Sequence, residues 1–261
     1  GGPGLGTIQP SQADYFQTEQ QTERLKKMYR TDRLATLGEL AAGAAHEIRN
    51  PLTAIRSTIQ YLSKDFSADP VKSEMVTELI SEVERINKIV QGLLSFARPS
   101  DLNTSDINIE QLINQTLLLV TNTLRKQNVE VEFEYFTDNT TIQGDAEQLK
   151  QVFLNIILNA VEAMGKNPPE RSRTLIISIE KGTPINTHSR YLIISFEDSG
   201  KGIEQKNIEN VFNPFFTTKE EGTGLGLAIC YGIINRHEGE IEVKSVPDKG
   251  TCINIKLPQR I

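Results

Sequence analysis

Apolar residues recur every three or four positions through most of the first hundred residues. One such stretch runs from Leu34 to Leu62, and a second runs from Val76 to Ala97 with spacings that alternate between three and four. This heptad pattern is typical of helices that pack side by side. Only a short polar segment, DFSADP, separates the two stretches. We therefore predict an antiparallel helical hairpin, because so short a connection joins neighbouring helices.

The predicted hairpin has a single apolar seam, so it buries little surface on its own. We therefore expect two copies of the chain to form a homodimer by pairing their hairpins in a four-helix bundle. The polar, periodic stretch from Tyr15 to Asp32 is predicted to extend the first helix backwards as a coiled-coil lead. Residues 1–13, which begin GGPGLGT, are interpreted as a leader or tag.

The pattern changes at residues 98–106, RPSDLNTSD. Beyond them we predict helices over 108–126 and 145–164, the second opened by Asp145 with Gln148 three positions later, as in a capping box. Four segments of β-branched and aromatic residues predict strands: TLIISIE, YLIISFED, EIEVKSV and TCINIKL. The last two flank PDKG, which predicts a hairpin with one buried face.

These elements indicate an α+β fold with two domains. The helical hairpin is assigned to residues 14–100, a linker to 101–105, and an α/β sandwich to 106–261. In the sandwich, helices are expected to cover one face of a mixed sheet.

The charge balance gives no support for nucleic-acid binding. The chain has 28 Lys and Arg residues against 34 Asp and Glu residues, a formal net charge of −6, whereas nucleic-acid binding calls for a basic patch. Cys230 and Cys252 lie far apart in the sequence, which favours a reducing compartment without a disulfide framework. No run of about 18 apolar residues predicts a membrane span. We expect a cytoplasmic location, with membrane attachment only through a sensor region outside this sequence.

His46, in the segment AHEIRNP, is one of three histidines in the chain. On a helix it lies about 200° from the seam residues Ala44 and Ile48, so it points away from the hairpin core. Asn50 shares its face at i+4, and Glu47 lies about 100° round the helix. The alternative is a solvated histidine without a role.

The surroundings of His46 favour a reactive group over a merely solvated one. The preceding residues 41–45, AAGAA, have small side chains, which would allow another domain to approach the imidazole closely. Pro51 has no N–H and leaves the carbonyl of Glu47 without its helical donor. We therefore expect a kink immediately after His46.

The predicted helix 145–164 carries one polar row on an otherwise apolar surface. Gln151, Asn155 and Asn159 follow one another at i, i+4 and i+8. Amide oxygens bind hard cations such as Mg²⁺, and amide nitrogens donate to phosphate. The row therefore predicts a site for a phosphate-bearing ligand and its metal ion; the alternative is an exposed polar face.

Asp198 ends the apolar strand YLIISFED and is followed by the glycine turn of Gly200 and Gly202. A carboxylate at a buried strand end needs a hydrogen-bond donor. Adenine offers one in its N6 amino group, where guanine has a carbonyl, so a single Asp selects adenine. The alternative is an ordinary Asp-Ser-Gly turn. Thr251, after Gly250, is expected to place a hydroxyl near the base, unless this segment is only a hairpin turn.

Residues 211–229 combine aromatic anchors, a polar glycine-rich stretch and a helix that is predicted to begin near Gly224. The free N–H groups of a helix N-terminus favour anions, and Lys219 is placed to meet a phosphate. We interpret the segment as a lid over the site; a solvated mobile loop is the alternative.

Five segments in order resemble the H, N, G1, F and G2 boxes of bacterial two-component sensor histidine kinases. They are HEIRNP, NIILNA, DSGKG, FNPFFTTK and GTGLGL, and the resemblance covers residues 31–258. The version TLGELAAGAAHEIRNPL is similar to that of sporulation and nitrogen-regulation kinases. The resemblance implies a dimerization and phosphoacceptor hairpin and a Bergerat-type ATP-binding domain, shared with gyrase and Hsp90. It implies autophosphorylation from ATP and Mg²⁺, then transfer to an aspartate of a response regulator.

The resemblance also implies a role for each matching residue. His46 is the implied phosphoacceptor, Glu47 the acidic residue that holds or deprotonates its ring, and Asn50 the residue that orients water when phosphatase activity occurs. Asn155 is the implied Mg²⁺ ligand, with Asn159 beside it, and Asp198 is the implied adenine partner. The implied phosphate-binding residues are Lys219, Gly222, Thr223, Gly224, Leu225 and Gly226.

Two other readings stay open from the sequence alone. One is a nucleotide-binding regulator or pseudokinase whose bundle only recruits partners. The other is a structural ATPase of the gyrase and Hsp90 kind, which the hairpin with an outward histidine disfavours. His188 and His237 are interpreted as structural or solvated. The outer faces of the bundle are a candidate docking place for a response regulator or an inhibitory protein.

Overall fold

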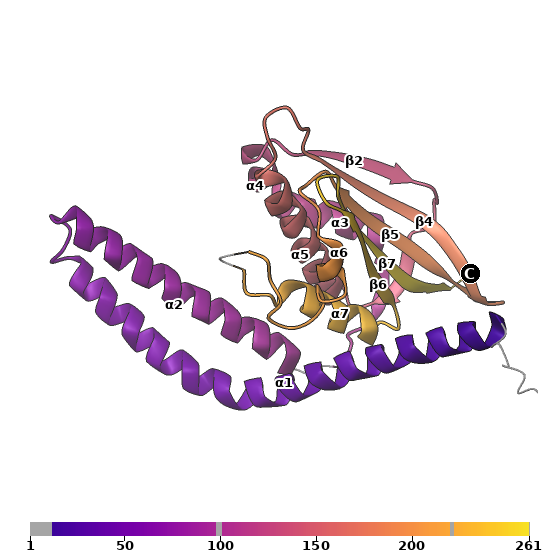
Figure 1. Cartoon of the computed structure of the whole chain (residues 1–261), viewed down its shortest axis with the longest axis horizontal. Coiled ribbons are helices and arrows are strands. Elements are labelled where there is room, and N and C mark those ends of the chain that lie inside the picture. Colours follow the sequence, from indigo (N-terminus) through magenta and orange to yellow (C-terminus); the bar gives the residue numbers. More distant parts are fainter. Residues whose placement is uncertain (1–11, 98–100, 220–221, 261) are drawn as a thin grey trace, which may run out of the picture.

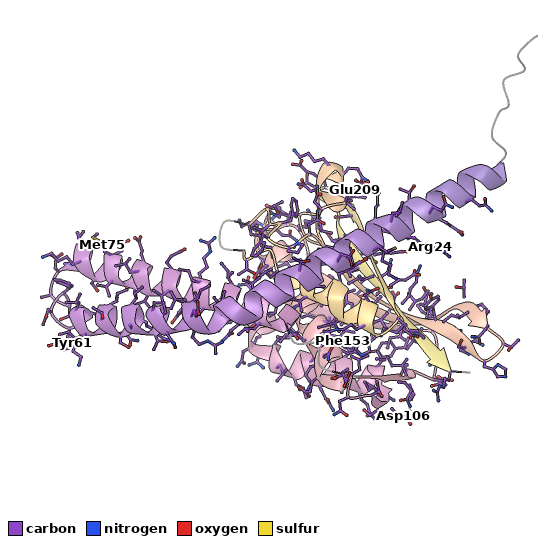
Figure 2. All side chains as sticks on the ribbon, turned by 90° about the horizontal axis from the view of Figure 1, so that it is seen from below. Arg24, Tyr61, Met75, Asp106, Phe153 and Glu209 are labelled. Atoms are coloured by element: carbon purple, nitrogen blue, oxygen red, sulfur yellow. The ribbon has the colours of Figure 1, made fainter. Side chains whose placement is uncertain are left out.

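The computed structural model describes residues 12–97, 101–219 and 222–260. Figure 1 shows a long helical hairpin that projects away from an α/β domain. In Figure 2, Tyr61 and Met75 mark the end of the hairpin, while Phe153 lies in the α/β domain. Within the described residues, no helix is long and apolar enough to cross a membrane.

The hairpin consists of α1 (Gln12–Ser63) and α2 (Pro70–Ala97). Leu52, Val83 and Val90 are buried between the two helices, as the heptad pattern predicts. Asp69 caps α2, since its Oδ1 accepts hydrogen bonds from the N–H groups of Val71 and Lys72 at 3.1 and 3.3 Å. The antiparallel hairpin predicted from the sequence is therefore confirmed.

The first helix is longer than its apolar pattern. The predicted lead is helical, and α1 begins at Gln12, so the last two residues of the expected 1–13 leader belong to the helix. The rest of that leader, residues 1–11, lies outside the described residues. α1 continues through Pro51 as one helix. Figure 1 shows α1 bending between its leading part and the part that pairs with α2, but a kink immediately after His46 stays a prediction.

The α/β domain contains a five-stranded sheet in the order β2-β4-β5-β7-β6. Its strands are β2 (Glu130–Tyr135), β4 (Thr174–Asn186), β5 (Ser189–Asp198), β6 (Glu240–Val246) and β7 (Gly250–Arg260). β2 pairs parallel with β4, and the other neighbours pair antiparallel. The mixed sheet and the β6–β7 hairpin are as predicted.

Helices cover one face of this sheet, as Figure 1 shows. They are α3 (Ile109–Leu119), α4 (Thr121–Lys126), α5 (Ala146–Gly165) and α7 (Gly226–Arg236), with the short α6 (Gln205–Ile208) beside them. The core forms between sheet and helices because alternate strand residues, such as Leu175, Ile177 and Ile179, are fully buried. The predicted α+β sandwich is confirmed.

Three details of the prediction need correction. The predicted helix 108–126 is divided at Val120, whose backbone leaves the helical conformation with φ of −111° and ψ of 10°. The predicted linker 101–105 ends one residue early, since Ser105 begins a short strand. That strand, β1 (Ser105–Asn108), pairs with β3 (Thr141–Gly144). The strands β1, β2 and β3 were not predicted from the sequence.

His237 is a buried hydrogen-bonded residue at the end of α7, which agrees with a structural role. Its Nε2 accepts from the N–H of Asp145 at 2.9 Å, and its Nδ1 lies 2.8 Å from the carbonyl oxygen of Ile233. This arrangement requires the neutral ring with its proton on Nδ1. Burial lowers the pKa of His237, with a further lowering from Arg236, against Ile233 and Asp145, which raise it.

Replacing His237 with Ala should lower the free energy of unfolding by about 1–3 kcal/mol at pH 7.5, because the N–H of Asp145 loses a buried acceptor. A lowered folded pKa means that this stabilisation is complete above the ordinary histidine pKa and is lost as the pH falls through the folded value. The difference in free energy of unfolding between wild type and His237→Ala, measured by urea denaturation, should therefore be smaller at pH 5.5 than at pH 7.5. His188→Ala, in an exposed turn, is the control. A difference in free energy of unfolding that increases as the pH falls would contradict a neutral, hydrogen-bonded His237.

Candidate nucleotide and phosphoacceptor site

The polar row of α5 lies at the surface of the helix that faces the 211–226 segment. α5 begins as predicted, since Asp145 Oδ1 accepts from Gln148 N at 3.1 Å. The opposite side of α5 is buried in the core, which leaves Asn155 and Asn159 half-buried. Asn155 Nδ2 donates to the carbonyl of Gly226 at 3.4 Å, so Asn155 touches the first turn of α7.

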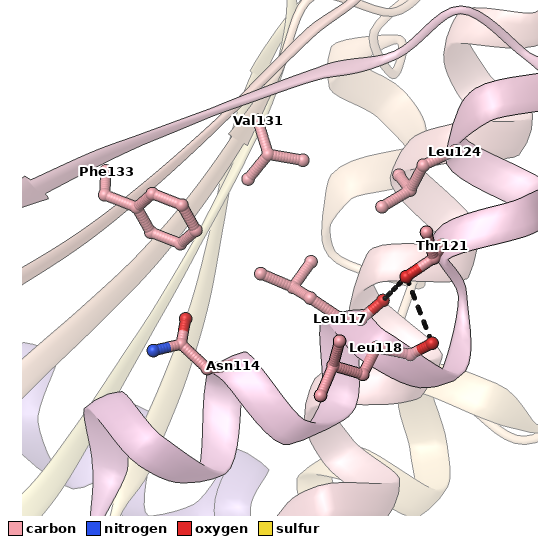
Figure 3. A pocket seen from close by; sticks show the side chains of 7 residues that line it. All are labelled: Asn114, Leu117, Leu118, Thr121, Leu124, Val131 and Phe133. Carbon is pink, nitrogen blue, oxygen red and sulfur yellow. Dashed lines mark hydrogen bonds between the residues drawn. The ribbon is translucent and has the colours of Figure 1, made fainter.

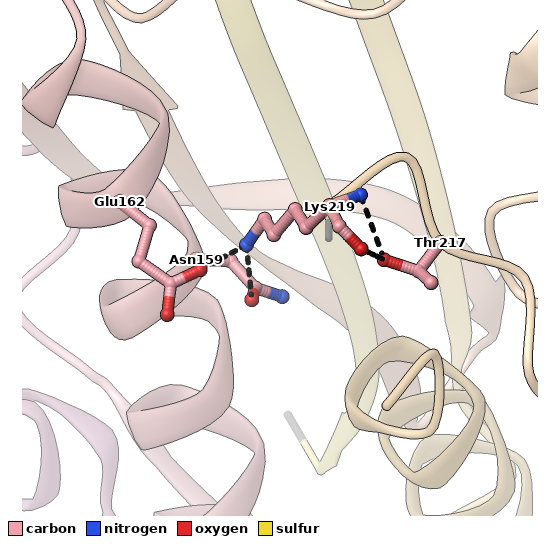
Figure 4. A network of polar contacts seen from close by, with 4 residues as sticks. All are labelled: Asn159, Glu162, Thr217 and Lys219. Carbon is pink, nitrogen blue, oxygen red and sulfur yellow. Dashed lines mark hydrogen bonds and ion pairs between the residues drawn. The ribbon is translucent and has the colours of Figure 1, made fainter. Parts of the chain in front are cut away.

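Lys219 crosses from the lid segment to the same helix, as Figure 4 shows. Its Nζ donates to Asn159 Oδ1 at 3.4 Å and forms an ion pair with Glu162. Thr217 fixes the backbone at Lys219, since Thr217 Oγ1 accepts from Lys219 N at 3.0 Å. The structure therefore brings together two of the predicted site residues, Lys219 and Asn159, that lie sixty positions apart.

Asp198 ends β5 as a buried carboxylate, 8% exposed. Its Oδ1 accepts from the N–H of Gly200 at 2.8 Å. Burial raises the pKa of Asp198 to about 6, although hydrogen bonds from the backbone of Gly200 and Thr251 and the charge of Arg171 lower it. The carboxylate is thus ionised at neutral pH and able to accept a further hydrogen bond from a ligand amine.

Thr251 lies directly opposite Asp198 in the pairing of β5 with β7. Its hydroxyl lies 2.8 Å from the hydroxyl of Ser245, a β6 residue that the sequence did not single out. Gly250 has φ of +121°, and a Cβ there would lie 1.9 Å from the carbonyl oxygen of Asp198. Only glycine permits this approach, so the hairpin end is built against the strand end that carries Asp198.

The turn after Asp198 needs its two glycines. A Cβ on Gly200 would lie 2.7 Å from Asp198 Oδ1. Gly202 has φ of +72°, and a Cβ there would lie 2.2 Å from the carbonyl oxygen of Val246. The close backbone approach predicted at Gly200 and Gly202 is therefore present, between chain segments of the protein itself.

The lid segment is anchored at both ends. Phe212 is buried and its ring lies 5.6 Å from that of Tyr231. Phe215, with φ of +66°, donates its N–H to the carbonyl of Gly224 at 2.9 Å. Residues 220–221 lie outside the described residues. Within the described part of the segment, Gly222 donates its N–H to the carbonyl of Lys219 at 3.3 Å. A Cβ on Gly222 would lie 2.4 Å from Thr217 Oγ1.

The segment 222–226 leads into α7, whose first residue is Gly226. No side chain of the described residues caps this helix N-terminus, and the hydroxyl of Thr223 accepts from the N–H of Leu225 at 3.4 Å. The unpaired N–H groups of such a terminus favour an anion. Leu225 itself is buried, and it packs against the hairpin at Gly92, where a Cβ would lie 2.8 Å from Leu225 Cδ1.

Gly224→Ala should lower affinity for ATP by tenfold or more and cost about 1–2 kcal/mol of stability. Gly224 has φ of +69°, and a Cβ would lie 2.4 Å from the carbonyl carbon of Phe215, so the lid must shift. Gly232→Ala, in the interior of α7 with no atom within 4 Å of the new Cβ, is the matched control and should bind ATP normally. Calorimetric titration with ATP measures both. Equal affinity for the two variants would show that the Gly224 backbone is not needed.

The predicted phosphoacceptor lies on α1, outside the α/β domain. Glu47 and Asn50 are exposed, as the outward face predicts. The backbone of His46 is helical, but its side chain lies outside the described residues, so its predicted direction is not tested. Ile48, two positions after His46, was predicted to lie in the seam but is 38% exposed.

Sequence reasoning missed several residues of the α/β site. Glu162 is exposed and extends the polar row of α5 by one turn beyond Asn159. Its spacing of three residues from Asn159 is the sequence signal that could have identified it. Asn167 and Arg171, in the loop after α5, donate to the backbone of the turn after Asp198. No local pattern marks these two residues, because only the tertiary fold brings the loop to the turn.

A second hollow, of about 430 Å³, contains none of the predicted site residues. It lies between β2 and the α3–α4 pair, where Figure 3 shows Phe133 and Val131 across from Leu117 and Leu124. Its walls are almost wholly apolar, and it offers no charged group for a phosphate. This hollow is therefore no candidate for binding phosphates, unlike the polar groups of α5 and Lys219.

Comparisons with known families and proteins agree with this division. Residues 36–102 match the His Kinase A (phospho-acceptor) domain, and residues 144–261 match the histidine kinase-, DNA gyrase B- and HSP90-like ATPase family. The histidine-protein kinase AtoS of Escherichia coli is 41% identical over 236 residues, which are 90% of this chain and 37% of AtoS. Sporulation kinase A of Bacillus subtilis is 38% identical over 92% of this chain and 37% of its own length.

Solved structures of the histidine kinase ThkA resemble the chain in both parts. Its catalytic domain has a TM-score of 0.51 and 30% identity over 60% of this chain and 98% of that domain. ThkA in complex with the response regulator protein TrrA has a TM-score of 0.63 and 29% identity over 91% of this chain and 66% of that one.

The fold and the two matched families define a two-domain kinase core. The chain belongs to the two-component sensor histidine kinases. It spans roughly a third to a half of the length of the curated relatives it matches.

Proposed function

We propose that this chain transfers the γ-phosphoryl group of ATP to His46 and then to an aspartate of a response regulator. The observation that carries the proposal is the contact between the start of α7 and α2, at Leu225 and Gly92. This contact supports the proposal, because Leu225 adjoins the candidate phosphate-binding helix end and Gly92 belongs to the hairpin that bears His46.

The contact falls near the level of His46 along the hairpin. Arg56 of α1 pairs with Glu84 of α2, and one hollow between the helices is lined by both Arg49 and Gln91. Because the helices are antiparallel, the turn of α1 just before Arg49 faces the turn of α2 just after Gln91. His46 and Gly92 therefore belong to adjoining turns, which supports phosphoryl transfer between the two domains.

The nucleotide is proposed to bind with its adenine at Asp198 and Thr251 and its phosphates at the lid. Asp198 accepts from the N6 amino group, and this acceptor selects adenine over guanine. Lys219 and the N–H groups of residues 222–226 neutralise phosphate charge. In this state Lys219 exchanges its partners Asn159 and Glu162 for phosphate oxygens.

The α5 row fits Mg²⁺ as a cofactor. Asn155 and Asn159 offer amide oxygens, and Glu162 adds a carboxylate, all hard ligands. No group of three or more His, Cys, Asp or Glu residues forms a metal cluster within the described part of the chain. Mg²⁺ is usually held by one or two protein oxygens together with substrate phosphates. When bound, Mg²⁺ neutralises charge on the transferring phosphoryl group. Asn155 stays the predicted ligand, and Asn159 is the one that contacts Lys219.

The chemistry requires mainly positioning. An imidazole nitrogen of His46 attacks the γ-phosphorus, an N–P bond forms, and the bond from that phosphorus to the β,γ-bridging oxygen breaks as ADP leaves. Glu47 is proposed to hold the other ring nitrogen and take its proton. A neutral imidazole is needed, and the ordinary histidine pKa of about 6.5 permits it at pH 7.

The phosphoryl group then passes to a response regulator that docks on the outer faces of the bundle. ThkA forms a complex with such a regulator. The exposed Asn50 is available to orient a water molecule that hydrolyses the phosphorylated aspartate, which is a separate phosphatase reaction. An inhibitory protein is a second candidate for the same faces.

The homodimer is supported by an apolar stripe on the hairpin. Ile48, Ile55 and Leu62 recur at intervals of seven on α1 and are 38–48% exposed, and Met75 and Leu79 are more than half exposed on α2. A second copy would cover this stripe and complete the four-helix bundle.

Ile55→Glu should convert the dimer to a monomer at micromolar concentration, because it buries a carboxylate without a partner. Ser57→Glu is the matched control, since Ser57 is exposed and lies about 200° round the helix from Ile55. Sedimentation velocity distinguishes the two. If the Ile55→Glu variant is still a dimer, the stripe that contains Ile55 does not form the dimer interface.

Incubation with γ-labelled or α-labelled ATP and Mg²⁺ tests the proposed activity. We expect label only from the γ-position, labile in acid and stable in alkali. Bound ATP without any label would favour the nucleotide-binding regulator over the kinase.

A further inference from the structure

The loop between α5 and β4 holds the turn that follows Asp198. Asn167 is 7% exposed, and its Nδ2 donates to the carbonyl of Ser199 at 2.9 Å. Arg171 Nη2 donates to the carbonyl of Gly200 at 2.7 Å. Two consecutive carbonyls after Asp198 are thus bound by side chains from one loop, and one of the donors is charged, which makes the bond stronger.

Further hydrogen bonds join the loop and the turn into one unit. Ser199 Oγ donates to the carbonyl of Ser172 at 2.8 Å and accepts from Thr174 N at 3.0 Å. The turn itself contains Gly200 and Gly202, whose backbones are adaptable without outside support. The N–H of Gly200 also donates to Asp198 Oδ1. A shift of this turn would therefore displace a hydrogen-bond donor of the Asp198 carboxylate.

Arg171 also acts on Asp198 by its charge. The groups that bear on this carboxyl are Arg171 from the loop, Glu197 from its own strand and Cys252 from β7. Burial raises the pKa of Asp198, and hydrogen bonds from the backbone of Gly200 and Thr251 lower it. The charge of Arg171 lowers it further, and that of Glu197 raises it. Arg171 is thus the side chain from an adjoining element that acts together with those two backbone hydrogen bonds to favour the ionised carboxylate.

We infer that Arg171 and Asn167 are positioning residues of the nucleotide site, which fix the turn beside Asp198, and that Arg171 also keeps the adenine-binding carboxylate charged. This inference rests on the proposed function, since it takes adenine to be the group bound by Asp198. On this inference, the loop after α5 influences the pH range over which the kinase binds ATP.

The test is calorimetric titration of the whole chain with ATP and Mg²⁺ between pH 5.5 and 8.5. Wild-type affinity should fall as the pH drops through about 6, where Asp198 is protonated. In Arg171→Met this fall should begin nearer neutral pH, so that affinity at pH 7 is about three- to tenfold below wild type and recovers in part at pH 8.5. Arg171→Lys keeps the charge and should keep the wild-type pH profile.

Asn167→Ala should act differently, because Asn167 carries no charge. Its affinity should fall by about three- to tenfold at every pH, with no movement of the profile. Lys166→Met removes one positive charge from the same loop at an exposed position and is the matched control, with wild-type affinity expected. If Arg171→Met does not fold, Arg171→Gln replaces it and should show the same movement of the profile.

The outcomes separate this inference from the proposed function. Wild-type protein that fails to bind ATP would overturn both. Wild-type protein that binds ATP, with Arg171 variants that share its affinity and pH profile, would overturn only the inference. A lower melting temperature with an unchanged profile would reduce Arg171 to a structural residue.

Discussion

His46→Gln should abolish phosphorylation of the chain while affinity for ATP stays within about twofold of wild type. Glutamine has no basic ring nitrogen to attack the γ-phosphorus, so the reaction has no nucleophile. The proposed nucleotide site lies in another domain, on α5, β5 and the lid, and does not include His46. Label from γ-labelled ATP and calorimetric affinity are measured on the same preparation.

His188→Gln is the matched control for that experiment. His188 lies in the exposed turn between β4 and β5, where its N–H bonds to Asn186. Its replacement should leave label and affinity unchanged. Label that persists in His46→Gln would move the phosphoacceptor to another residue and would leave the hairpin as a dimerization element alone.

Asp198→Asn should weaken ATP binding by about tenfold to a hundredfold and remove phosphorylation at ATP concentrations that saturate the wild type. A hydrogen bond to a charged group contributes about 1.5–3 kcal/mol, and each 1.4 kcal/mol changes affinity about tenfold. The fold should survive, because burial disfavours the charge of Asp198 in the absence of ligand. Loss of binding without loss of melting temperature is therefore the expected combination.

Glu197→Gln is the control for Asp198→Asn, since Glu197 is the preceding residue of β5 and its exposed side chain points to the other face of the sheet. It should bind ATP with wild-type affinity. Titration with GTP is a second check, and wild type should prefer ATP. Equal affinity of Asp198→Asn and wild type for ATP would separate this carboxylate from adenine recognition.

The long-period patterns of the sequence predict most of the fold. The heptads predict α1 and α2, and Asp145 with Gln148 marks the start of α5. The interruption at Val120 could not be predicted, because no Gly or Pro marks it in the sequence. β2 was missed although Val131, Phe133 and Tyr135 alternate with glutamates in a way that is typical of a strand.

The candidate site was predicted as separate segments, and the tertiary structure adds how they meet. Sheet register sets Thr251 opposite Asp198, and Lys219 reaches Asn159 and Glu162 only because the lid folds over α5. Arg171 and Asn167 carry no local signal, since their partners are carbonyls that any residue has. The side chain of His46 lies outside the described residues, so its outward direction stays a prediction from helical geometry.

The central claim is that the α/β domain phosphorylates His46. Mass spectrometry of peptides prepared at alkaline pH, after incubation of the wild-type chain with ATP and Mg²⁺, tests it most directly. The account predicts one phosphoryl group on the peptide that contains His46, absent when ATP is replaced by ADP. A phosphoryl group on a serine, a threonine or another histidine, with His46 unmodified, would contradict it.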